Sequence, residues 1–317
     1  MLVVGYTALR GMEDVRRILL IWTGLAAASG LWSIGQFWQK YSQAQALHQD
    51  FYLYYVANRV TGFMSHWMTF SAQMMVAGLM LAALIMCRGA MKRRLWLIPA
   101  LVIIAVSIVI AQTRSVWLGT TLGMLYLIVT CRPKFLIAVP LLAVAGWMIA
   151  PTAIRERVLS MYRPHGQTDS NDHRRVTFRT GLEMIKSHPW FGLGPEIPKR
   201  DFELYIPADI TRPLPTGFYG HLHNVYLQYA AERGIPTLLA FLFMIGTIIV
   251  DFARSLRRLP REESFRRAVL HGALAALIGL LAEAFLEHNL NDSEVLTMFL
   301  VIVVSGYIAA RREQAHA

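Results

Sequence analysis

Long apolar segments separated by polar connections run through most of the chain. Eight of them are long enough, as helices, to cross a hydrocarbon core of about 30 Å, three only at the short limit. The eight segments cover residues 18–38, 66–87, 95–111, 115–130, 135–150, 234–251, 268–286 and 294–310. The pattern predicts an all-α fold, a polytopic membrane-embedded helical bundle in which residues 1–317 form a single transmembrane domain.

Arginine and lysine are distributed unevenly between these segments. If the N-terminus lies inside, the connections around Arg16, Arg93, Arg132 and Arg261 are cytoplasmic, and the short connections on the other side carry few basic residues. Short cytoplasmic loops retain Lys and Arg, so the distribution predicts a multi-pass protein with both termini in the cytoplasm. The first apolar segment lacks a small-residue cleavage site and is expected to be a retained helix.

Composition excludes several other classes. Of the 317 residues, 55% are hydrophobic and 16% are charged, against about 25% charged in soluble domains, so an ordinary soluble, disordered or fibrous protein is excluded. The net charge of +11 would suggest nucleic acid in a soluble protein, but here membrane topology accounts for it and no nucleic acid is expected. Cys87 and Cys131 are too few for a disulfide framework or a zinc site.

One connection, residues 151–233, is far longer than the others and is expected to lie outside and carry the chemistry. A helix is predicted to begin near Asp172 and to end before Pro189. Several prolines between residues 195 and 215 then favour irregular structure. A second helix is expected from His221, broken at residues 234–236. The sequence Gly-Leu-Gly-Pro at 192–195 is interpreted as a turn, since it lacks the third glycine of a dinucleotide site.

His223 and its neighbours are the first candidates for acid–base chemistry. An imidazole titrates near neutrality and can accept a proton from an attacking hydroxyl, so His223 is a candidate general base and His221 the alternative. Both can equally be solvated histidines at a membrane interface. Asn224, Gln228 and Glu232 recur at helical spacing. They can orient the histidine or a bound sugar, or they can equally form a hydrated helix face.

Arginines form the second group of candidates. Arg114 stands between two apolar segments on the side that otherwise avoids basic residues, although an arginine there can also extend to lipid headgroups. Arg174, Arg175 and Arg179 lie on the predicted loop helix and can equally form a solvated face. Together with Arg59, these side chains can clamp a pyrophosphate, because a planar guanidinium forms paired hydrogen bonds with phosphate.

Motifs for other chemistries are missing from the sequence. It contains no Asp-x-Asp pair for a metal on a sugar nucleotide, no phosphate-binding glycine-rich loop and no nucleophile elbow. No cofactor and no metal ion are therefore expected.

Several stretches resemble the O-antigen ligase family in combination. They are RVTFRTGLEMIKSHPWFGLGP from Arg175 to Pro195, HNVYLQ from His223 to Gln228, ERGI from Glu232 to Ile235, RVTGFMSH from Arg59 to His66, and QTRS from Gln112 to Ser115. The resemblance covers about residues 55–310. Phe178 stands where the family often has Trp. The family also usually has more membrane spans, so the N-terminal helices of the family are expected to be absent from this chain.

The resemblance implies a bacterial inner-membrane glycosyltransferase of lipopolysaccharide biosynthesis. Such enzymes take a glycan from an undecaprenyl diphosphate carrier at the periplasmic face, and ligases attach it to lipid A-core. It implies that His223 is the essential histidine and that Arg114 and Arg175 bind the diphosphate. Further expected substrate-binding residues are Arg59, Arg174, Arg179, His221, Asn224, Tyr226 and Gln228.

The resulting hypothesis is metal-independent, inverting transfer of O-antigen or a similar glycan. A polymerase that extends a carrier-linked chain, or a protein O-oligosaccharyltransferase, would share this architecture and differ in the acceptor. From another class, a flippase or transporter of lipid-linked sugars would use the arginines to line a path and His223 as a proton relay. Membrane lipids are expected partners, and the oligomeric state stays open.

Overall fold

The computed structural model describes residue 9 and residues 11–87, 94–160, 171–262 and 264–311, and all regular structure within these ranges is helical. The α-helices are α2 (Met12–Ala46), α3 (Phe51–Ala57), α4 (Trp67–Met86), α5 (Ile98–Ile110), α6 (Arg114–Cys131), α7 (Ala138–Ile149), α8 (Thr152–Leu159), α9 (Asn171–Ser187), α10 (Ile197–Arg200), α11 (Val225–Arg258), α12 (Ser264–Glu283) and α13 (Ser293–Ala310). Short 3₁₀ helices are η1 (Arg94–Leu97), η2 (Pro133–Ile137), η4 (Phe202–Tyr205) and η5 (Asn289–Asn291). The predicted all-α polytopic bundle is confirmed.

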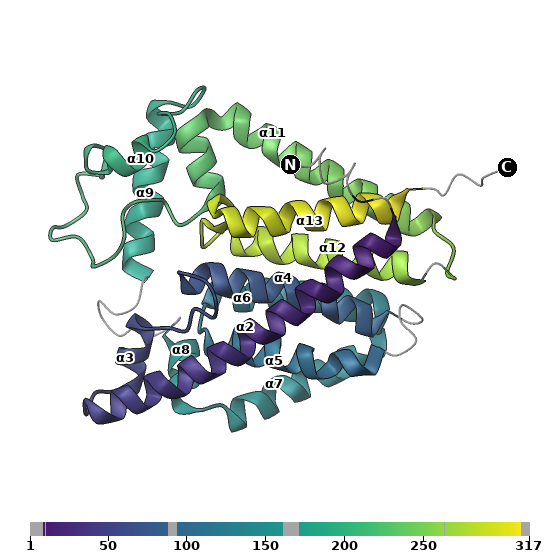
Figure 1. The fold of residues 1–317 in the computed structure, drawn as a ribbon. Coiled ribbons are helices and arrows are strands. Elements are labelled where there is room, and N and C mark those ends of the chain that lie inside the picture. Colours follow the sequence, from purple (N-terminus) through teal and green to yellow (C-terminus); the bar gives the residue numbers. More distant parts are fainter. Residues whose placement is uncertain (1–8, 10, 88–93, 161–170, 263, 312–317) are drawn as a thin grey trace.

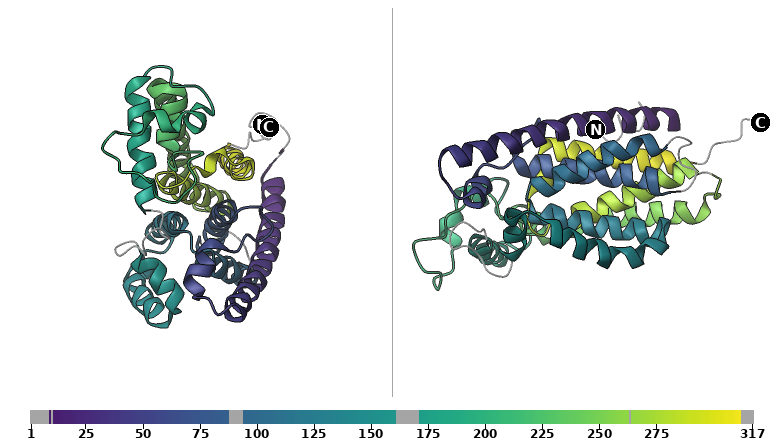
Figure 2. Two further views of the ribbon diagram at one scale, coloured as in Figure 1. Left: turned by 90° about the vertical axis from the view of Figure 1, so that its left-hand side faces the viewer. Right: turned by 90° about the horizontal axis from the view of Figure 1, so that it is seen from below.

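Each of the eight predicted segments falls on a helix, but the helices differ in length. Six of the described helices are long and apolar enough to cross a membrane: α2, α4, α6, α11, α12 and α13. The apolar helix at Leu95–Ile110 is shorter, and the helix at Pro133–Ile149 bends by 118° into α8. The first segment forms a longer helix than expected, Met12–Ala46, which runs along the outside of the bundle (Figure 2).

Close packing between α6 and α12 is built from small residues. A Cβ atom at Gly119 would lie 2.5 Å from the carbonyl oxygen of Gly279, and one at Gly123 would lie 2.8 Å from that of Ala275. Small residues four apart on both helices let the two backbones touch. Lipid tails are as apolar as the helices, so membrane helices associate through close packing of this kind and not through a hydrophobic driving force. Buried α4 packs against both helices and forms the centre of the bundle.

The long connection folds against one end of this bundle (Figure 1). Its helix α9 begins near Asp172 and ends before Pro189, as the sequence predicted, and packs against α11. A small apolar core, distinct from that of the bundle, holds the connection together. It contains Val176, Met184, Phe202, Leu222, Leu227 and Ala231.

The predicted break in the second loop helix occurs at Gly234. This residue has φ 82°, so α11 bends sharply there. The turn after α9 docks on the bend through backbone hydrogen bonds: Leu193 N donates to Ala231 O at 2.8 Å, and Ile235 N donates to Pro189 O at 2.8 Å. The bend therefore fixes the start of α11 relative to α9.

Replacing Gly234 with Ala is expected to destabilise the protein. A Cβ atom there would lie 2.1 Å from the carbonyl oxygen of Trp190, and the backbone has a positive φ; strain of this kind costs on the order of 1–3 kcal/mol. Thermal unfolding in detergent measures the loss. The matched control is Gly246→Ala in the same helix, where a Cβ atom meets nothing within 4 Å and stability should hold or rise slightly. Equal melting temperatures for the two variants would contradict the role of the bend.

Candidate active site

A polar cavity of about 630 Å³ lies where the long connection meets the end of the bundle. Its lining includes four arginines, four histidines and three carboxylates. They are Arg59, Arg114, Arg157 and Arg174; His66, His173, His221 and His223; and Glu287, Asp292 and Glu294. These residues come from the connection before α4, from the start of α6, from α8, α9 and the loop before α11, and from the segment after α12 into the start of α13.

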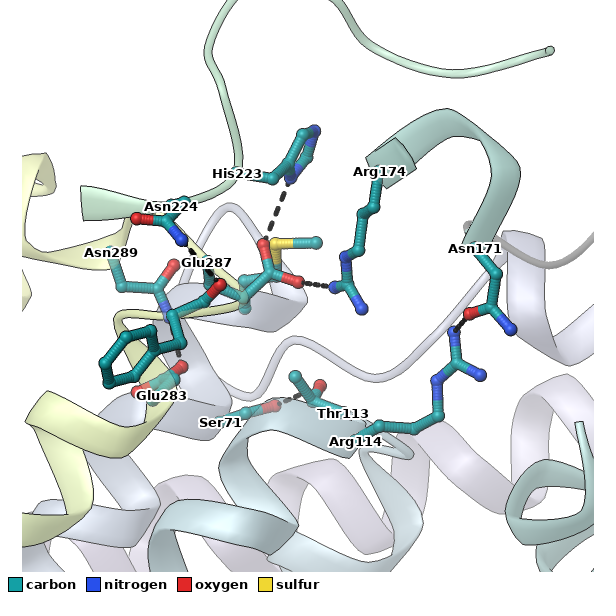
Figure 3. A network of polar contacts seen from close by, with 12 residues as sticks. Ser71, Thr113, Arg114, Asn171, Arg174, His223, Asn224, Glu283, Glu287 and Asn289 are labelled. Atoms are coloured by element: carbon teal, nitrogen blue, oxygen red, sulfur yellow. Dashed lines mark hydrogen bonds and ion pairs between the residues drawn. The ribbon is translucent and has the colours of Figure 1, made fainter. Parts of the chain in front are cut away.

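Glu287 is the buried centre of this site. Its side chain is 1% exposed, and it accepts hydrogen bonds from Nη2 of Arg174 and from the His223 ring, whose Nδ1 lies 3.3 Å from Oε2 (Figure 3). Burial raises the pKa of Glu287, but Arg174 and His223 lower it by more, so the pKa lies below its ordinary value. The group is therefore an ionised carboxylate at neutral pH.

His223 lies between two hydrogen-bond acceptors. Nδ1 faces Glu287, and Nε2 lies 3.2 Å from the carbonyl oxygen of Phe218. With an acceptor at each ring nitrogen, the orientation of the ring is fixed. A buried carboxylate on one nitrogen orients an imidazole and stabilises its protonated form, which is how such pairs serve in general base catalysis.

The backbone around His223 is fixed by the helix that follows it. His223 has φ 50°, and the next residue, Asn224, caps α11: its Oδ1 accepts from Leu227 N at 3.0 Å, and its Nδ2 donates to Phe285 O at 2.9 Å. Val225 N also donates to Ala284 O at 2.9 Å. The start of α11 is thus tied to the end of α12, and His223 is held close to Glu287.

Three further arginines gather beside this pair, and neutral oxygen atoms help to hold them. Arg114, at the start of α6, donates to Asn171 Oδ1 at 2.9 Å, and Arg157 Nε donates to Gln112 O at 3.1 Å. Arg59 Nε donates to Val56 O at 3.2 Å. The pKa of Arg59 is lowered to about 9, first by burial and then by repulsion from Arg157. Crowded buried cations of this kind would be stabilised by an anionic ligand.

The cavity contains five of the residues predicted from sequence: Arg59, Arg114, Arg174, His221 and His223. The other five predicted residues do not line it.

Arg175 is exposed and does not line the cavity, and Arg179 forms a paired salt bridge with Asp209, both contacts being 2.8 Å. Residues 175 and 179 are four apart and share the outer face of α9, whereas Arg174 is turned by about 100° toward the bundle. Of these neighbouring arginines, Arg174 lines the cavity and Arg175 does not.

Three residues predicted to contact substrate form hydrogen bonds within the protein. Asn224 caps α11 as described, and the Tyr226 hydroxyl donates to Leu281 O at 2.8 Å. Gln228 accepts from Leu222 N at 2.8 Å and donates to Glu232 Oε1 at 2.7 Å. None of the three lines the cavity; they hold the loop that carries His221 and His223.

Sequence reasoning missed Glu287, His173 and Arg157. The signal for Glu287 was weak: the connection at 287–293 has acidic residues and no Lys or Arg. His173 is buried beside His223, with ring centroids 4.9 Å apart. A Cβ atom at Gly217 would lie 2.2 Å from the His173 ring, so only glycine lets this loop approach so closely. Arg157 belongs to the charged stretch at residues 155–157, and the sequence gives no indication that it lies near His223.

Residues 99–242 match the family model described as O-antigen ligase. The match extends from α5 into α11 and includes Arg114, Arg157, Arg174 and His223. It confirms the resemblance found in the sequence, and with the apolar helices it identifies a multi-pass membrane protein. No curated protein matches the chain.

The buried histidines predict that stability falls as the pH drops below about 6.5. Burial, and then repulsion from His223, lower the pKa of His173 to about 4 and that of His221 to about 3. In the unfolded chain both rings take up protons near the ordinary value of 6.5, so the unfolded chain binds more protons across this window and the free energy of unfolding decreases toward lower pH. Thermal unfolding in detergent at about pH 7 and about pH 5 measures the change.

The His173→Gln variant should show a shallower pH dependence than the unmodified protein. The matched control is His188→Gln, which removes an exposed histidine after α9 and should leave the pH dependence unchanged. An identical pH dependence in His173→Gln and the unmodified protein would contradict the role of this ring.

Proposed function

We propose, from the match of residues 99–242 to the O-antigen ligase family model, that the chain transfers O-antigen, or a similar glycan, from undecaprenyl diphosphate to lipid A-core at the periplasmic face of the inner membrane. The observation that carries the proposal is the pairing of His223 with buried Glu287 in a cavity that also contains Arg59, Arg114 and Arg157. A base and an anion-binding cluster in one cavity are the two parts that this transfer needs.

The arginines would bind the diphosphate of the donor. A guanidinium stays charged at neutral pH and forms two parallel hydrogen bonds with phosphate oxygens. Arg114 and Arg157 are 8% and 4% exposed, so their charges act in a medium that screens them weakly. Arg174 takes the role first assigned to Arg175, since it reaches the cavity while bound to Glu287. These groups would stabilise the negative charge that develops on the leaving diphosphate.

His223 would act as the general base. Its Nε2 takes the proton of the acceptor hydroxyl as that oxygen attacks the anomeric carbon of the donor glycan. The bond from this carbon to the diphosphate oxygen breaks, and its electron pair leaves with undecaprenyl diphosphate, which inverts the configuration. Glu287 holds the ring and stabilises the imidazolium that forms. General base catalysis of this kind contributes about 10² to 10⁴ in rate.

The acceptor hydroxyl must first take the place of the Phe218 carbonyl, which lies 3.2 Å from Nε2. The lone pair of Nε2 must then face the acceptor hydroxyl, because a base needs a free lone pair. Phe218 is itself 59% exposed, and residues 216–218 line the cavity. Entry of the acceptor and activation of His223 are therefore the same local movement.

The same architecture serves a polymerase, and the acceptor distinguishes the two reactions. A flippase is less well supported, because the cavity residues gather at one end of the bundle instead of following a path through it. The arginine cluster offers the positive charge that a divalent metal would otherwise supply to the diphosphate. Transfer is accordingly expected to need no added metal.

Reconstituted transfer tests the proposal. Purified protein in liposomes is incubated with undecaprenyl diphosphate glycan, lipid A-core and EDTA, and the products are resolved by size and mass. Glycosylated lipid A-core should form, and His223→Ala should slow its formation by at least about 10²-fold because the base is lost. His188→Ala, at an exposed site, is the matched control and should retain full turnover.

Near-normal turnover in a folded His223→Ala variant would remove this residue from the base role. Longer carrier-linked glycans as the only product would identify a polymerase. Transfer that stops in EDTA would show that a metal is required.

A further inference from the structure

A second basic cavity lies at the opposite end of the same helices. Helices α4 and α6 begin at the active-site cavity and end at Met86 and Cys131, while α12 runs the other way from Ser264. The second cavity is lined by Cys87, Cys131 and Ser264 among others. Helices of 18 to 20 residues span on the order of 30 Å, the thickness of a hydrocarbon core. The two cavities are therefore separated by one membrane thickness.

The lining of this second cavity is strongly positive. It has a volume of about 640 Å³ and contains four cationic side chains, Arg132, Lys134, Arg261 and Arg267, beside His271. Among the described residues, no carboxylate lines it, in contrast to the active-site cavity with Glu287. A concentration of cations without internal compensation favours an anionic ligand.

Two of the arginines are held in place by backbone carbonyls at helix ends. Arg132 Nε donates to Met86 O at 2.7 Å, at the end of α4. Arg267 Nη1 donates to Leu256 O at 2.7 Å and to Leu259 O at 3.0 Å, at the end of α11. A guanidinium has five N–H donors, so each of these side chains keeps further donors after these bonds. In the part of the chain that the structure describes, neither forms an ion pair with a carboxylate.

Apolar side chains complete the cavity and indicate the kind of anion. Phe135 and Pro133 line it next to the basic residues, and Phe135 is 56% exposed, as is Ile137 at 79% in the same 3₁₀ helix η2. Exposed apolar residues beside fixed cations at a helix end are suited to the boundary between headgroups and acyl chains. Basic pockets between membrane helices bind phospholipid headgroups in this way.

We propose that this cavity binds the phosphate of an anionic phospholipid headgroup in the leaflet opposite to the active site. Arg132 and Arg267 would bind the phosphate oxygens, and Lys134 and Arg261, which are more exposed, would contribute longer-range attraction. Phe135 would contact the glycerol and the first acyl carbons. A bound lipid would join η2 to the start of α12 through the arginines that line the cavity.

Native mass spectrometry of the full chain in neutral detergent tests this site. The probes are phosphatidylglycerol, phosphatidylcholine and inorganic phosphate, each titrated separately. Phosphatidylglycerol should bind to the unmodified protein, and the Arg132→Gln/Arg267→Gln variant should bind it more weakly by about fivefold per arginine. Arg258→Gln, which removes an exposed arginine from the end of α11 outside the cavity, is the matched control and should change the affinity by less than about twofold.

A second variant keeps the test valid if loss of both arginines prevents folding. Lys134→Gln/Arg261→Gln changes two exposed residues and should also weaken binding of phosphatidylglycerol, without changing the melting temperature of the lipid-free protein. Equal phosphatidylglycerol affinity in the cavity variants and Arg258→Gln would overturn the proposal. So would equal binding of phosphatidylcholine, or binding of inorganic phosphate with no preference for the lipid.

Discussion

The buried carboxylate of Glu287 is the constraint on which the outer half of the molecule depends. A charge that is 1% exposed is tolerated only if it is paired and hydrogen-bonded, and removing one partner of such a pair costs about 3–5 kcal/mol. Its partners are Arg174 on α9 and His223 before α11, while Glu287 itself follows α12 (Figure 3). One charge thus joins the long connection to the bundle.

This constraint also explains how an irregular loop can hold His223 in a fixed geometry. Between residues 195 and 215, which contain many prolines, only the short helices α10 and η4 form. His223 is nevertheless fixed on both sides, by Glu287 at its ring and by the capped helix at its backbone. The sharp bend at Gly234 then keeps α9 and α11 in contact. The carbonyl of Phe218 faces Nε2 of His223 from the exposed side of this loop, and in the proposed reaction an acceptor would displace it.

The sequence predicted the elements more successfully than the contacts between them. The limits of α9 and the break near residues 234–236 followed from caps, prolines and glycines, which act locally. The helix Met12–Ala46 extends beyond its apolar part because residues such as Gln43 and Gln45 favour helix outside the membrane as well. The number of spans was harder to predict, since the segments near residues 95–111 and 135–150 form short or bent helices.

For the site, the residue types were predictable and their faces were not. His223, Arg114 and Arg59 stood out because a charged or titratable group near a membrane segment is costly and needs a reason. The choice between Arg174 and Arg175 depends on which face of α9 meets the bundle, and the pairing of His223 with Glu287 joins residues 64 apart in sequence. Tertiary packing decides both, and local patterns do not carry that information.

Comparison of Arg174→Gln with Arg175→Gln in the reconstituted transfer reaction tests most directly whether this cavity binds the donor. Both variants remove one charge from adjacent positions on α9, and a melting curve verifies that each is folded. The geometry predicts that Arg174→Gln lowers kcat/KM for the lipid-linked donor by at least about tenfold, the effect of about 1.4 kcal/mol, while Arg175→Gln stays within about twofold. A loss confined to Arg175→Gln, or equal losses in both, would contradict the assignment of the cavity as the donor site.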